Sequence, residues 1–519
     1  MKRILFFLIT ILIFNTGCKK FLEKTPSEGG IAGFESADQF DALLNEIRIT
    51  RNRYEWNTIM YGSDDCHYHP DWQTTSATYQ QREAFNVWNN NELRGITGTS
   101  NGFNMAWSYM YTFNYITDRI DAPEISGSEL LKSQVKGEAM FWRAFYYFNL
   151  AVQYAMHPGL NNGNYPGLAY RNTVSTDPET YSDRRTIRYT MDGIVNDLDQ
   201  AERLLREGGK ADMNTSTPWR ITVPAVHALR ARVELYQGNY KTAFDHAKQA
   251  YNAYEFLYDM NDASLFTMVN RTNTSATCNG TPVAFATQSP TISGFGGNST
   301  HAHGLWNYKE SFFRFVCQIS AIDKLPPTQE LYDMYAAEDL RKVKFYDNNM
   351  NAANSPFSPC RKDELISKNY MKHAINASRS GYVLGVSVPE VMLIMAECRA
   401  RGAGDGQPAN ETLKALRKTR FPTGYTDNIG STLKDVLDER RRELAFVMRW
   451  YDVKRYNALD NANITISKLA RRDVYQLNSD FVTHRLAPNA LAYAQPIPET
   501  EIVLLKTWAQ NETGGITVQ

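Results

Sequence analysis

The most regular hydrophobic pattern in the chain spans residues 434–456. Its apolar side chains fall in two adjacent rows at helical spacing, and no Gly or Pro interrupts it. Two adjacent rows make a wide apolar face, so the pattern predicts one continuous helix that several neighbours bury. Charges beside a buried face must be paired, and Glu439–Arg442 and Arg449–Asp452 stand three residues apart, where helical side chains meet. We therefore expect a structural hub of ion pairs here, with an active site as the alternative.

Helical patterns recur through most of the chain and predict a mainly α-helical protein. Ser36 and Gln39 form a capping box that opens the first helix. A turn at Gly238 and Asn239 separates two later helices, and the alanines that follow it fit the second half of a tetratricopeptide repeat. The expected helices span about 36–51, 103–120, 137–154, 190–206, the two halves of 224–251, and a further pair at 388–401 and 410–420.

Two aromatic, polar stretches interrupt the helices, at 54–88 and about 290–315. Their Asn, Ser, Thr and Gln content predicts irregular loops, and the whole segment 258–385 is expected to be loop-rich. An aromatic ring covers the C–H face of a sugar while Asn, Gln, Asp or Arg side chains bind its hydroxyl rim. Loops on a rigid frame commonly carry function. The candidate ligand-binding residues are Trp72, Trp88, Trp306, Tyr308, Asn307 and Asp65. The alternative is that these aromatics pin the loops to the frame.

The balance of charge argues against a nucleic-acid role. The chain has 56 basic and 56 acidic residues and no long basic run. Beyond Cys18, the remaining cysteines are odd in number and widely spaced, so neither a zinc site nor a disulfide framework is expected. Cys398 falls on an apolar helical face and is most simply a small core residue.

Motifs of the common enzyme classes are missing from the sequence. It has no G-x-S-x-G, P-loop, H-E-x-x-H or Rossmann glycine pattern, so we expect no enzyme and no cofactor. His67 and His69 beside Asp64 and Asp65 are the best metal candidates, but such spacing is common in polar loops, and no metal is expected. Asp64 and Asp65 also make a poor glycosidase pair, because adjacent residues of an extended loop point to opposite sides.

The first 17 residues have the form of a targeting segment. Lys2 and Arg3 precede an apolar run that is too short to span a bilayer. The run ends at Gly17 and Cys18, similar to a bacterial lipoprotein box, although Asn15 stands where Leu is usual. Cleavage there leaves Cys18 as an acylated first residue, which anchors the protein stably. An ordinary secretory peptide is the alternative.

Five motifs carry information beyond their periodicity. They are CKKFLEKTP at 18–26, an R-A-F-x-Y-F-x-L helix within 137–155, an E-V-x-L-x-x-A-E helix within 388–401, ERRRELAF with RWYDVKRYN at 439–457, and P-I-P-x-x-E-I within 492–502. In this order they resemble the SusD/RagB family of nutrient-binding outer-membrane lipoproteins, over nearly the whole chain. None of them lies in the aromatic loops, so the family's ligand residues do not transfer by motif.

The resemblance implies tetratricopeptide-like helix pairs that form a superhelical frame with a loop-rich inserted subdomain. It implies a protein that faces the cell exterior from the outer membrane and delivers oligosaccharides to a SusC-like TonB-dependent transporter. Binding of peptides, as in some RagB-like members, and a surface glycoside hydrolase are the alternatives. The expected divisions are a signal peptide (1–17), a lipidated N-terminus and linker (18–35), an N-terminal helical region (36–257), the insertion (258–385) and a C-terminal helical region (386–519).

Overall fold

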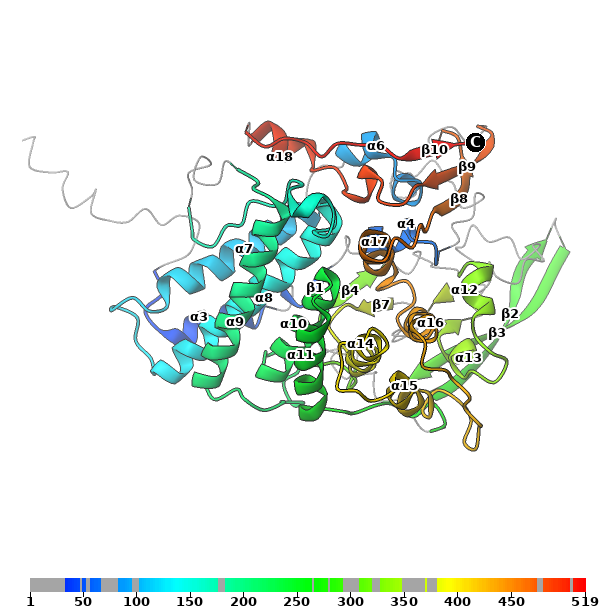
Figure 1. The fold of residues 1–519 in the computed structure, drawn as a ribbon, viewed down its shortest axis with the longest axis horizontal. Helices are drawn as coiled ribbons and strands as arrows, with labels where there is room; N and C mark the ends of the chain where they lie inside the picture. Colours follow the sequence, from blue (N-terminus) through cyan, green and yellow to red (C-terminus); the bar gives the residue numbers. More distant parts are fainter. Residues whose placement is uncertain are drawn as a thin grey trace, which may run out of the picture.

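Helices dominate the architecture, and the described part of the chain adds four sheets of two or three strands (Figure 1). The computed structural model describes residues 33–46, 49–52, 57–66, 83–95, 102–175, 183–263, 266–278, 281–292, 308–319, 327–347, 369–370, 380–473, 479–504 and 507–519. Within these ranges, no helix is both long enough and apolar enough to cross a membrane.

A stack of neighbouring helices forms the frame of the molecule. Helix α7 lies against α8, α8 against α9, α9 against α10, α10 against α11, and α11 against α14, which also contacts α15 and α16 (Figure 1). The bounds are α3 Ala37–Leu44, α7 Gly102–Arg119, α8 Glu129–Tyr154, α9 Ile187–Glu207, α10 Val223–Gln237, α11 Tyr240–Ala253, α14 Val388–Ala400 and α15 Ala409–Arg417. The prediction of a mainly α-helical protein built from tetratricopeptide-like pairs is confirmed.

Local sequence signals explain where several of these helices begin and end. Ser36 and Gln39 close the predicted capping box, with the Ser36 amide donating to Gln39 Oε1 at 3.1 Å. Gly238 adopts a φ of 87° between α10 and α11, a backbone conformation that glycine takes without strain. Every side chain from Phe141 to Tyr154 is buried, because α8 runs through the centre of the stack.

The predicted continuous helix over 434–456 is wrong in its middle. Helix α16 spans Leu433–Glu443 and α17 spans Arg449–Leu459, and Phe446 between them has a φ of 62°. The Phe446 amide donates to the Asp65 carboxylate at 2.9 Å. A tertiary contact therefore replaces the helical hydrogen bonding that the local sequence allows.

Strands occupy part of the segment that was expected to be irregular. A long antiparallel hairpin, β2 Phe266–Cys278 and β3 Thr281–Ile292, extends to one side of the helical stack (Figure 1). The C-terminal region adds a three-stranded antiparallel sheet in the order β10-β9-β8, formed by Ile516–Val518, Phe481–Leu486 and Ile466–Arg471. The mainly helical prediction thus needs these two additions.

The remaining elements are short. The helices are α4 Asn57–Gly62, α6 Asn90–Arg94, α12 Gln329–Asp333, α13 Arg341–Lys344 and α18 Glu499–Leu504, with 3-10 turns η4 Asn161–Gly163 and η7 Leu491–Tyr493. The strands are β1 Arg51–Asn52, β4 Val316–Ile319, β5 Tyr346–Asp347, β6 Asn369–Tyr370 and β7 Ser380–Val383. Sheet β1-β4-β7 joins residues 51–52 to two strands within 258–385.

Candidate ligand-binding site

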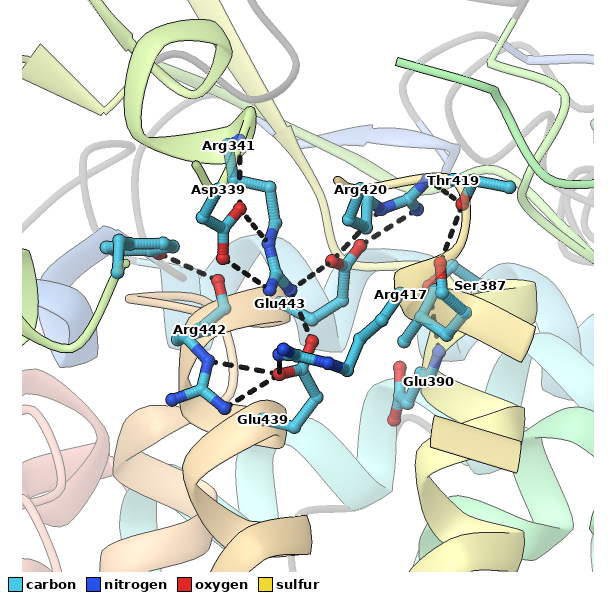
Figure 2. A network of polar contacts seen from close by, with 12 residues as sticks. Asp339, Arg341, Ser387, Glu390, Arg417, Thr419, Arg420, Glu439, Arg442 and Glu443 are labelled. Atoms are coloured by element: carbon cyan, nitrogen blue, oxygen red, sulfur yellow. Dashed lines mark hydrogen bonds and ion pairs between the residues drawn. The ribbon is translucent and has the colours of Figure 1, made fainter. Parts of the chain in front are cut away.

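A buried network of ion pairs, which we call the hub, joins α13 to α16. Arg341 donates to both oxygens of Asp339 at 2.9 and 2.7 Å and to Glu443 at 2.9 Å, and it lies 2.7 Å from Glu439 Oε1 (Figure 2). All four side chains are fully buried. Burial alone would lower the pKa of Arg341, and the charges of Glu439 and Asp339 raise it instead. The arginine therefore stays charged inside the protein because carboxylates surround it.

The hub extends to the loop after α15. Arg420 donates to Glu443 at 3.0 Å, and Arg417, the last residue of α15, donates to Glu439 at 2.7 Å (Figure 2). Arg420 also donates to Glu310 at 2.9 Å. Glu439 and Glu443 thus each bind arginines from two other segments of the chain. The expectation of a structural hub is confirmed, since these charges neutralise one another and are closed off from solvent.

The two ion pairs predicted within 434–456 have different outcomes. Glu439 and Arg442 do meet, at 2.7 Å. Arg449 does not pair with Asp452, because it binds Asp64 at 2.6 Å, while Asp452 pairs instead with Arg440 at 2.9 Å and with Arg455. Arg449 and Asp452 both lie in α17 and keep their helical spacing, so the break does not separate them. Two hydrogen bonds to Asp64 take up the Arg449 guanidinium instead.

Asp64 and Asp65 both bind arginines that flank this break. Arg449 donates to Asp64 at 2.7 and 2.6 Å, and Arg441 donates to Asp65 at 2.8 Å. The two carboxylates lie in a turn and converge on the same pair of arginines, so the expectation that they point to opposite sides is wrong. Burial would raise the pKa of Asp64, but the Arg449 charge lowers it well below its usual range. This carboxyl is therefore unsuited to donate a proton as a glycosidase acid does.

Two of the predicted aromatic ligand residues are buried in the frame. Trp88 is 3% exposed, and its Nε1 donates to the Gly62 carbonyl at 3.1 Å. Tyr308 is also 3% exposed, and its hydroxyl donates to the buried Glu310 carboxylate. Burial raises the pKa of Tyr308 well above its usual value. Both rings are held by the protein itself and present no open face to a ligand, as the loop-pinning alternative expects.

The other predicted site residues lie outside the described residues. They are Cys18, Trp72, Trp306 and Asn307, together with the metal candidates His67 and His69. Across the ranges that the structure describes, no group of three or more His, Cys, Asp or Glu side chains could hold a metal ion. Cys66 and Cys398 are buried free thiols. The prediction that Cys398 is a small core residue is confirmed.

An open cavity of about 380 Å³ lies between α7, α8, α9 and the segment 170–172. Its floor is the buried pair of Arg143 and Asp197, joined by two hydrogen bonds of 2.6 and 2.7 Å. Arg143 also donates to Asn114 at 2.9 Å, and Tyr170 donates to Asp197 at 2.5 Å. Burial alone would lower the pKa of Arg143, and Asp197 more than offsets this. The floor is thus polar and internally satisfied.

The rim of this cavity carries side chains that face solvent. Tyr189, Asp192 and Asn196 are exposed and follow one another on α9 at spacings of three and four residues. Asp118 of α7 stands on the rim as well. None of these residues belongs to a sequence motif or to the aromatic loops. Their helical spacing could mark a common face, but only packing shows that this face borders a cavity.

The sequence matches two models of known protein families. Residues 20–235 match a SusD-like family described as starch-binding and associating with the outer membrane, and residues 388–513 match the SusD family. The chain belongs to the SusD family. Among curated proteins, none matches this sequence.

Solved structures share the fold over most of the SusD-like chain. A SusD superfamily protein from Bacteroides thetaiotaomicron superposes with a TM-score of 0.64 at 17% identity, covering 92% of this chain and 100% of the other. A SusD-like carbohydrate binding protein from Bacteroides vulgatus gives 0.59 at 15%, covering 91% and 97%. Surface glycan-binding protein A from Bacteroides thetaiotaomicron gives 0.56 at 17%, covering 88% and 92%. At these identities the likeness shows the fold alone.

Proposed function

We propose that this protein binds oligosaccharides at the cell surface, without enzymatic activity, and delivers them to a SusC-like TonB-dependent outer-membrane transporter. The observation that supports this most is the family match at both ends of the chain. Fold relatives described as carbohydrate- or glycan-binding proteins point the same way. The binding of Asp64 and Asp65 to arginines, with Asp65 fully buried, speaks against the hydrolase alternative.

The principal ligand site is proposed for the aromatic loops, on Trp72, Trp306 and Asn307. An indole ring stacks on the C–H face of a sugar, and an amide binds its hydroxyl groups. Trp88, Tyr308 and Asp65 are assigned a supporting role in this proposal, because each is buried against the frame.

A binding panel tests this function. The intact protein, Trp72→Ala and Trp306→Ala are each measured against immobilised glycans and against a peptide pool, with the melting temperature recorded for each variant. We expect glycan binding that falls at least tenfold in one of the two variants while the melting temperature holds. Binding to peptides alone would establish the RagB-like alternative. New reducing ends from a bound glycan, lost in Asp64→Asn, would establish the hydrolase.

Anchoring through Cys18 is a separate part of the proposal. Acyl chains on the first mature residue hold a protein at a membrane when several chains are attached. Cys18→Ala is expected to abolish acyl labelling and to release the protein into the soluble fraction. Retention of Cys18→Ala in the membrane fraction would place the anchor elsewhere.

A further inference from the structure

We propose that the cavity between α7, α8 and α9 is a second saccharide-binding site, selective for neutral sugar units. This inference rests on the proposed glycan-binding function and adds a site to it. The cavity volume of about 380 Å³ falls in the range of roughly 300–1,000 Å³ in which proteins hold small ligands. Its walls come from α7–α9 and the segment 170–172, and none of its residues belongs to the aromatic stretches 54–88 and 290–315.

The floor of the cavity is rigid before any ligand arrives. Arg143 donates to Asp197, Asn114, Thr117 and the Asn172 carbonyl, so its guanidinium is held from several sides. The Tyr170 ring packs so closely on Gly193 that a Cβ there would lie 2.8 Å from it. A preformed surface loses little conformational freedom on binding, which favours affinity.

The rim offers the two kinds of contact that a sugar needs. The Tyr189 residue is 44% exposed and provides an aromatic surface. The guanidinium carbon Cζ of Arg185 lies over the ring, 4.8 Å from its centroid. Met140 adds an apolar wall on α8. Asn196 and Asp192 stand beside Tyr189 on the same helical face and can bind hydroxyl groups. Apolar area with a few polar groups around it is the usual composition of a small-molecule site.

The charges at the rim select against acidic sugars. Asp118 and Asp192 are exposed carboxylates. The cations nearby are already paired, since Lys136 binds Asp121, Arg143 binds Asp197, and Arg185 beside the Tyr189 ring lies 3.5 Å from the Asp183 carboxylate. The negative charge of a uronic acid or a sulfated sugar would be repelled by these carboxylates, and no unpaired cation of the cavity lining would offset that repulsion. A neutral sugar would not be repelled.

Two exposed tyrosines provide a matched test. Tyr111 on α7 is also 44% exposed but does not line the cavity. In a Trp72→Ala/Trp306→Ala background, binding of maltohexaose, xylohexaose, mannohexaose and hexagalacturonate is measured by calorimetry for Tyr189→Ala, Tyr189→Phe and Tyr111→Ala. We expect the background to retain weak binding of at least one neutral hexasaccharide. Tyr189→Ala should weaken it at least fivefold, while Tyr189→Phe and Tyr111→Ala keep it and all melting temperatures agree.

The outcomes separate this proposal from the function on which it rests. If the intact protein binds none of a wide glycan panel, the proposed function fails. If the intact protein binds glycans but Tyr189→Ala equals Tyr111→Ala on every neutral sugar, the second site alone is overturned. Tighter binding of hexagalacturonate than of the neutral sugars at this cavity would likewise overturn it.

Discussion

The hub and the cavity floor contain the same chemical unit in different surroundings. In the hub, Arg341 donates two hydrogen bonds to the Asp339 carboxylate, and in the cavity floor Arg143 donates two to the Asp197 carboxylate. Both pairs are almost completely buried. The hub is closed by further charged side chains, whereas the floor borders an open cavity. A buried ion pair alone therefore does not distinguish the two regions, and the open cavity beside Arg143 and Asp197 does.

The two units also differ in what they connect. The hub joins α16 to Asp339 and Arg341, at the start of α13, and to Arg420 after α15 (Figure 2). Arg143 and Asp197 join two neighbouring helices of the frame, α8 and α9. Loss of a hub residue thus uncouples several segments at once, and loss of a floor residue affects one helix pair.

The largest expected effect is that of breaking the hub. Arg341→Met leaves Asp339, Glu439 and Glu443 buried without their shared cation. Removing one partner of a buried pair typically costs about 3–5 kcal/mol. We expect this loss in the free energy of unfolding, measured by chemical denaturation. A loss under ~1 kcal/mol would show that the network contributes little to stability.

Acid should weaken a second buried ion pair, which lies outside the hub: Arg455 of α17 donates to Glu397 of α14 at 2.9 Å. Burial would raise the pKa of Glu397, but Arg455 outweighs this and lowers it from 4.5 to about 2. The stability that this ion pair contributes is therefore complete above pH 4.5 and is lost as the pH falls through 2. The lowered pKa corresponds to ~3 kcal/mol. The gap in unfolding free energy between the wild type and Glu397→Gln should narrow over this range, and a gap that stays constant would contradict the assignment.

Breaking the cavity floor is expected to cost less than breaking the hub. Asp197→Asn removes the charge that faces Arg143 but keeps the shape of the side chain. Water in the adjoining cavity can solvate the guanidinium in part, so we expect about 1.5–3 kcal/mol, the range for hydrogen bonds to charged groups. Denaturation beside Arg341→Met measures the difference. An equal loss in both variants would mean that the open cavity makes no energetic difference.

Much of the frame follows from local sequence, and the corrections come from distant contacts. The capping box at Ser36 and the turn at Gly238 could be read directly, because each depends on residues next to it. The break at Phe446 could not, because its cause is Asp65, far earlier in the chain. The Thr and Asn content of the hairpin β2–β3 predicts a loop, yet Thr also favours strands.

The candidate sites show the same division. Trp88 sits in a polar stretch that resembles a sugar-binding loop, and only the packing of its ring against Gly62 shows that it supports the frame. The rim of the cavity, conversely, comprises ordinary helix surface residues such as Tyr189. Composition identifies side chains able to bind sugars, but exposure beside a cavity depends on how three helices pack.

The smallest effect is expected at an arginine that the hub does not include. Arg314 is buried, and its Nε and Nη1 atoms have no hydrogen-bond partner in the part of the chain that the structure describes. Burial lowers the pKa of Arg314 to about 9. Arg314→Met removes a charge that is costly to bury and leaves no carboxylate behind, while the Met side chain keeps the apolar packing of the stem.

We therefore expect Arg314→Met to change the free energy of unfolding by no more than ~1 kcal/mol, or to increase it. Arg341→Met is the matched comparison, because the same substitution is made at an equally buried arginine that carboxylates surround. If Arg314→Met and Arg341→Met lower the free energy of unfolding equally, the loss reflects side-chain packing. The ion pairs of Arg341 would then contribute no additional stability. A neutral or stabilising Arg314→Met beside a damaging Arg341→Met would show that paired carboxylates, rather than burial, make an arginine indispensable to this fold.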